Sequence, residues 1–188
     1  EGLKGDKEIV LAAVEQNWEA LQYASKQLRK DKSLVLAAIK QDGGAITYAS
    51  KELRHDKQVA LVAVTESGEA LQQVGRKLKS DKDVVQAAIT QSGNALRFAS
   101  KRIRNSREVV LAGVKRNGDI LQHATKRIQA DRHVVLAAVK QNGNVLQYAA
   151  QHLKGDKEIV LAAVKNCPEA LKFAMHSLKQ DRDCMKAA

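Results

Sequence analysis

The sequence predicts an all-α solenoid, and two observations support that prediction. The 188-residue chain repeats every 25 residues, and the repeat is marked by a series of acidic residues that Ser106 alone interrupts: Asp6, Asp31, Asp56, Asp81, Asp131, Asp156 and Asp181. Between these markers the apolar residues follow the spacing of a helix face. We expect one continuous array over residues 1–188, with partial units at both ends and seven complete two-helix repeats at 6–30, 31–55, 56–80, 81–105, 106–130, 131–155 and 156–180.

The first helix of each repeat is predicted to begin at the marker residue. In the first copy the apolar residues Ile9, Val10, Ala13 and Val14 share one helix face, and Asp6 stands at the preferred N-cap position. The valine-rich runs are also compatible with strands. The Ala-Ala pair and the lack of two-residue alternation favour a helix.

A second apolar stripe predicts a second helix, which in the first copy carries Ala20, Leu21, Ala24 and Leu28. Lys26 and Arg29 lie near its end, where cations interact favourably with the helix dipole. Helices of about 10 residues are only ~15 Å long and are unstable alone in water. They must stack on their neighbours, so a long surface and a binding role are expected.

Five copies carry glycine between the two helices, whereas Trp18 and Pro168 stand there in the outermost complete copies. The position could be a left-handed C-terminal cap, which prefers glycine, or the first residue of the second helix. Proline cannot adopt a positive φ, so the second interpretation is favoured, and the glycines then indicate a close backbone approach. For Trp18 we prefer a location effect at an array end. A partner contact is the secondary hypothesis, because tryptophan is enriched at binding hot spots.

Composition limits the class of protein without naming its partner. Only 3% of residues are aromatic, which suits closely packed helices. The net charge of +11 suits an acidic partner such as protein, nucleic acid or anionic membrane. No run is long and apolar enough to span a bilayer, and the first residues do not resemble a signal peptide. Cys167 and Cys184 have no partner cluster, so we expect a cytoplasmic or other reducing intracellular compartment.

No motif for catalysis, metal binding or cofactor binding stands out. The five histidines occupy five different repeat positions, which argues against a ladder of ligands. Cys167 and Cys184 could approach each other, but a zinc site needs two further ligands. Phosphate loops, nucleophile elbows and paired-carboxylate motifs are not found in the sequence. We expect a protein that is not an enzyme and that uses no cofactor.

The basic residues form two ladders at fixed repeat positions. One follows the marker residue, at Lys7, Lys32, Lys57, Lys82, Arg107, Arg132, Lys157 and Arg182. The other lies near the repeat end, at Lys4, Arg29, Arg54, Lys79, Arg104, Lys154 and Lys179, with Gln129 as the exception. Ion pairs between neighbouring repeats explain much of this pattern.

Such ion pairs do not account for residues 97–132, which carry a local excess of seven positive charges. The candidate partner-binding residues are therefore Arg97, Lys101, Arg102, Arg104, Arg107, Lys115, Arg116, Lys126 and Arg127. Nucleic acid would use such ladders mainly for phosphate contacts. A mostly aromatic repeat position, which includes Tyr23 and Phe98, could stack on bases but is better explained by packing between helices.

The repeat motif at residues 6–28, with the Val-Leu-Ala-Ala block and the Ala-Leu-x-Tyr-Ala block, resembles the repeats of the domain-of-unknown-function family numbered 4116. The resemblance extends to Asn166-Cys167-Pro168-Glu169 and covers essentially the whole chain. It implies a helical-repeat module without assigned chemistry, found in bacterial and protist proteins, some of them effector-like. It supplies no catalytic residues, and it is compatible with delivery as an effector.

Our leading hypothesis is a scaffold that binds a protein or peptide, with an acidic partner at the basic stretch. The alternative is nucleic-acid binding that is independent of sequence. Glu1 is expected to start within a second helix and Ala188 to end within a first helix, which suggests a fragment or missing capping elements. Exposed apolar ends would then favour end-to-end self-association.

Overall fold

The computed structural model describes residues 2–188, and every regular segment in that range is helical. This confirms the predicted all-α repeat fold. The expectation for Glu1 lies outside the described residues. Contacts divide the chain into two compact units, the first ending at Ser100 and the second spanning Lys101–Ala188.

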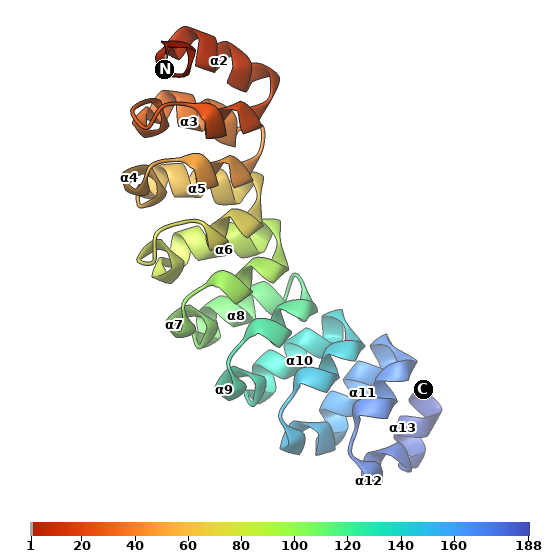
Figure 1. The fold of residues 1–188 in the computed structure, drawn as a ribbon. Helices are drawn as coiled ribbons and strands as arrows, with labels where there is room; N and C mark the ends of the chain where they lie inside the picture. Colours follow the sequence, from red (N-terminus) through yellow and green to blue (C-terminus); the bar gives the residue numbers. More distant parts are fainter. Residues whose placement is uncertain (1) are drawn as a thin grey trace. The chain divides into compact units, whose positions relative to one another are not determined.

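A long α-helix opens each repeat, and within each unit consecutive long helices pack side by side (Figure 1). The marker residue caps each one, as predicted: Oδ1 of Asp56 accepts hydrogen bonds from the amides of Gln58 and Val59. The first unit contains α2 (Lys7–Gln16), α3 (Lys32–Ile39), α5 (Lys57–Glu66) and α6 (Lys82–Gln91). The second contains α8 (Arg107–Val114), α10 (Arg132–Gln141), α11 (Lys157–Asn166) and α13 (Arg182–Ala187).

The second half of each repeat differs from the single helix that we expected. It begins as a 3₁₀ helix, namely η1 (Trp18–Tyr23), η3 (Gly43–Tyr48), η4 (Gly68–Gln72), η6 (Gly93–Phe98), η7 (Gly118–His123), η8 (Gly143–Tyr148) and η10 (Pro168–Phe173). A separate short turn follows and leads to the next marker residue. These turns are η2 (Leu28–Lys30), α4 (Lys51–Arg54), η5 (Leu78–Ser80), α7 (Lys101–Arg104), α9 (Lys126–Gln129), η9 (Gln151–Gly155) and α12 (His176–Lys179), and α1 (Gly2–Gly5) precedes the first marker.

A hydrogen bond between repeats explains the break. Ala49 adopts an extended conformation with ψ 155°, which frees the next amide from the helix. That amide, on Ser50, donates to the carbonyl of Arg29 in the preceding repeat at 2.8 Å. Met175 and Lys154 repeat the bond in the second unit at 2.9 Å. The apolar spacing alone could not reveal this break, because buried apolar residues continue through both segments, as Ile46 and Leu53 do.

The core of each unit is a row of small aliphatic side chains. In α6 the buried residues are Val84, Val85, Ala88 and Ile89, and η6 adds Ala95 and Leu96. The first repeat deviates, because only short α1 covers the outer side of α2. Its Ile9 is 45% exposed, whereas the equivalent Ile159 is fully buried.

The glycine position is confirmed as the first residue of the second helical segment of the repeat. Trp18 and Pro168 are the first residues of η1 and η10, and residues 2–188 include no positive φ. A Cβ added to Gly43 would lie 2.2 Å from the carbonyl oxygen of Ala63 in the next repeat. The backbones meet so closely there that a side chain does not fit without displacement.

Candidate functional site

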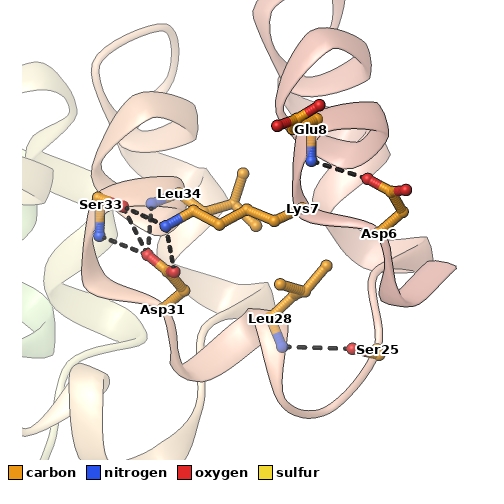
Figure 2. A network of polar contacts seen from close by, with 8 residues as sticks. All are labelled: Asp6, Lys7, Glu8, Ser25, Leu28, Asp31, Ser33 and Leu34. Carbon is orange, nitrogen blue, oxygen red and sulfur yellow. Dashed lines mark hydrogen bonds and ion pairs between the residues drawn. The ribbon is translucent and has the colours of Figure 1, made fainter.

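The first basic ladder forms a series of ion pairs between consecutive repeats, and Figure 2 shows the first of them, between Lys7 and Asp31. Nζ of Lys7 lies 2.6 Å from Oδ2 of Asp31, while Oδ1 of Asp31 accepts hydrogen bonds from the amides of Ser33 and Leu34. The hydrogen bond from Lys7 is the main reason why the pKa of Asp31 is well below its ordinary value. A single carboxylate therefore caps one helix and binds the preceding repeat.

The same contact recurs within both units. The pairs are Lys32–Asp56 at 2.8 Å, Lys57–Asp81 at 2.9 Å, Arg107–Asp131 at 2.8 Å, Arg132–Asp156 at 2.8 Å and Lys157–Asp181 at 2.9 Å. Several of these cations contact a second acid three residues into the next repeat, as Arg132 contacts Glu158. Most charges of this ladder thus stabilise the array. The predicted role of ion pairs between neighbouring repeats is confirmed.

Most of the second ladder is half-buried on the short turns, at Arg29, Arg54, Lys79, Arg104 and Lys154, whereas Lys4 and Lys179 are exposed. Nζ of Lys79 donates to the carbonyl of Gln72 at 2.6 Å, and burial is the first cause that lowers its pKa. The buried Gln129 donates to the carbonyl of Leu121 at 3.1 Å. The Nε atoms of Arg29, Arg54 and Arg104 are buried, with no hydrogen-bond acceptor among the described residues. Most residues at this repeat position are half-buried, which leaves little charge for a ligand along a continuous track.

The candidate residues of the predicted basic patch are distributed over both units. Arg97 belongs to the first unit, where its guanidinium lies 2.9 Å from Glu69 and 4.5 Å from the ring centre of Phe98. The other candidates belong to the second unit. Of these, Arg104 is half-buried and Arg107 pairs with Asp131.

The remaining candidates form two groups at opposite ends of the long helices. The turn edge consists of the exposed residues Lys101, Arg102, Lys126 and Arg127 on α7 and α9, beside the starts of α8 and α10 (Figure 1). Arg127 donates there to the side chain of Asn105 at 2.9 Å. Lys115 and Arg116 follow the last residue of α8, about 12 Å along the helix from its start. These candidates are close in sequence, but the fold places them at opposite ends of the long helices.

A groove was not predicted from the sequence. Leu136, Leu161 and Ala162 on α10 and α11 line a shallow pocket of about 530 Å³ together with Lys140, Lys165, Asn166 and Glu158. A second pocket of about 300 Å³ shares Leu136 and Lys140 and adds Lys115, His133, Ala137 and Gln141. The signal was present as Leu and Lys at the sixth and tenth positions of these repeats, but such spacing does not by itself distinguish a groove from an ordinary helix surface.

Charge is distributed unevenly between the two units. Residues 101–188 contain 17 Lys and Arg against 8 Asp and Glu, a net charge of +9. Residues 1–100 contain 15 against 13, a net charge of +2. Nearly all of the net charge of the chain therefore belongs to the second unit.

Trp18, the secondary candidate, lies in the first unit beside Tyr48, with 6.1 Å between ring centres. It is half-buried. The contact with Tyr48 gives Trp18 a packing role.

The residues that could support metal or thiol chemistry do not gather. Residues 2–188 contain no group of three or more His, Cys, Asp or Glu side chains that could hold a metal ion. Cys167 and Cys184 are both free, and burial raises the pKa of the Cys184 thiol. Across the same described range, no helix has the length and apolar character to cross a membrane.

The repeated helices, their shared carboxylate caps and the exposed cationic surfaces define a helical-repeat protein. A family model for a domain of unknown function, DUF4116, matches residues 6–54, 56–104, 106–154 and 156–188. The chain therefore belongs to the DUF4116 family, as its motifs indicated, and the first three matched segments each span two of the 25-residue repeats. No curated protein and no solved structure matches the chain.

Proposed function

We propose that this chain is a non-enzymatic scaffold whose second unit binds an acidic protein or peptide. The main support is the concentration of positive charge, +9 over residues 101–188, on an array whose acids are largely engaged. Asp131, Asp156 and Asp181 each bind a cation of the preceding repeat. The exposed cations that remain give this unit a strongly positive surface.

Protein is favoured over nucleic acid because most of the first basic ladder forms ion pairs and most of the second is half-buried. A phosphate backbone would need cations at regular intervals along an accessible track. Most of the first ladder binds Asp residues, and most of the second is half-buried, as Lys79 is where it donates to the carbonyl of Gln72. The exposed lysines instead border apolar side chains such as Leu136 and Leu161, which suit a peptide.

Binding to defined probes tests this proposal. Fluorescence anisotropy would compare a labelled peptide of Glu and Leu with a matched peptide of Gln and Leu and with random single- and double-stranded oligonucleotides. We expect the Glu-containing peptide alone to bind at physiological salt, because oligonucleotide binding through few phosphate contacts is weak there. Tighter binding of either oligonucleotide would overturn the proposal in favour of nucleic acid.

We also propose that the chain functions in a reducing compartment, since Cys167 and Cys184 are free.

A further proposal concerns the N-terminal end of the first unit, where Leu3 is 70% exposed and Ile9 is 45% exposed beside a mostly apolar pocket. Such a surface favours end-to-end self-association. Light scattering should show a mass that rises with concentration and falls in the Ile9→Lys variant, whereas a constant monomer mass would contradict self-association.

A further inference from the structure

Two adjoining pockets of the second unit lie along α10, one bordered by α11 and the other by Lys115 just after α8, and we refer to the two together as the groove. The two pockets share Leu136 and Lys140. Leu136 and Leu161 are half-exposed in its floor. Its whole lining belongs to the second unit, which keeps the groove within one compact body.

Helix periodicity explains why the groove has an apolar floor. The inner face of α10 consists of the buried residues Val134, Val135, Ala138 and Val139. Residues three or four apart lie on the same side of a helix. The outer face of α10 therefore carries His133, Leu136, Ala137 and Lys140. Because α11 repeats this pattern, leucine follows leucine and lysine follows lysine across the groove.

The two rims of the groove differ in electrostatic character. On the rim near the helix starts, Glu158 contacts Arg132, which also pairs with Asp156. On the rim near the helix ends, Lys115, Lys140 and Lys165 are exposed and form no ion pair with any described residue. The partial negative charge at helix C-termini offsets only part of these three charges. A row of unpaired cations thus follows one side of an apolar floor.

We propose that this groove binds an extended, acidic segment of another protein, with apolar side chains on Leu136 and Leu161 and carboxylates at Lys140 and Lys165. Packed helices lie about 8–10 Å apart. An extended polyproline-type chain rises ~3.1 Å per residue and returns to the same face every three residues. Acidic residues three apart in the ligand would therefore meet successive lysines. The inference rests on the proposed function and specifies its site and partner.

The first unit supplies matched replacements for testing this site. At the position of Lys140 and Lys165, α5 and α6 carry Thr65 and Thr90, and at the position of Leu136, α6 carries Gln86. Lys140→Thr with Lys165→Thr, and separately Leu136→Gln, should therefore preserve the fold. At the turn edge, Gln151 occupies the position of Lys101 and Lys126, so Lys101→Gln with Lys126→Gln is a control with the same charge change.

Selection from a displayed library of random peptides, with the full chain as bait, tests the proposal without knowing the partner. We expect selected peptides to combine apolar residues with Asp or Glu three residues apart. Their affinity should fall about tenfold in the Lys140→Thr, Lys165→Thr variant, since two surface charge contacts are lost. Leu136→Gln should also weaken binding, whereas the Lys101→Gln, Lys126→Gln control should bind normally. Circular dichroism would verify that each variant is folded.

Other outcomes separate the site from the general function. If acidic peptides lose affinity only in the Lys101→Gln, Lys126→Gln control, the groove is not the binding site, although an acidic partner is still supported. Selected peptides without apolar residues, or with acids seven apart as on a helix, would overturn the extended apolar contact. A selection that yields no acidic peptides would overturn the proposed function itself.

Discussion

The ammonium group of Lys57 lies 2.9 Å from Oδ2 of Asp81, and Oδ1 of the same carboxylate accepts hydrogen bonds from the amides of Asp83 and Val84 at 3.0 and 3.2 Å. Asp81 thus links one repeat to the next and caps the helix that it precedes. An exposed ion pair alone contributes little, whereas an N-cap contributes typically about 1 kcal/mol. The combination makes the marker residue more important than its exposure suggests.

Two substitutions at Asp81 should separate the cap from the ion pair. Asp81→Ala removes both and should lower the free energy of unfolding by about 1–2 kcal/mol. Asp81→Asn retains an oxygen that can cap α6 and should cost less than about 1 kcal/mol. Urea unfolding followed by circular dichroism measures both. Equal losses would show that the ion pair, and not the cap, is the main contribution.

Stability should decrease in acid. The hydrogen bond from Lys32 is the main reason why the pKa of Asp56 is lowered in the folded state. A carboxyl group with a depressed folded pKa stabilises the protein at neutral pH, and that contribution is lost as the pH falls below about 4 and through the folded pKa. Thermal unfolding at a series of pH values should show this loss. The stability difference between wild type and Asp56→Asn should shrink in acid, and a constant difference would contradict the prediction.

The interrupted marker series offers a stabilising substitution. Oγ of Ser106 accepts from the amide of Val109 at 3.5 Å, whereas Oδ1 of Asp131 accepts from the amides of His133 and Val134 at 3.0 and 3.1 Å. Ser106→Asp should stabilise α8 by about 0.3–1 kcal/mol through a stronger cap and the helix dipole. An increased urea midpoint would confirm this. A decreased midpoint would show that Ser106 has another structural role.

The close approach at Gly43 should make alanine costly there. Its Cβ would lie 2.2 Å from the carbonyl oxygen of Ala63, so the two repeats must move apart. We expect Gly43→Ala to lower stability by about 1–3 kcal/mol. Gly5→Ala is the matched control, because a Cβ there meets no atom within 4 Å, and it should be neutral or slightly stabilising. Similar losses in both variants would argue against the backbone contact.

Trp18 can report on the location of binding. It is the one tryptophan in the sequence and lies beside Tyr48 in the first unit. Because the proposed groove belongs to the second unit, saturation with an acidic peptide should leave tryptophan emission unchanged. A spectral shift that disappears in Tyr48→Leu, where the ring neighbour is lost, would instead indicate a partner contact near Trp18.

Local features were predicted more reliably than the surface. The caps at residues such as Asp56 and the first-turn position of Trp18 follow from backbone chemistry within a few residues. The break after Ala49 was missed because it depends on a hydrogen bond from Ser50 to Arg29 in another repeat. The basic patch was divided for a similar reason. Lys101 and Lys115 are near in sequence but lie at opposite ends of α8.

Periodic apolar residues and capping residues act locally and recur in register, so the repeat, its length, its helical character and its family could all be predicted from the amino-acid order. Which charges remain accessible depends instead on how the repeats stack. Lys57 and Lys140 are both exposed lysines, yet stacking brings Asp81 to the first and leaves the second beside Leu136 and Leu161. Contacts between repeats, which no single repeat encodes, make this difference.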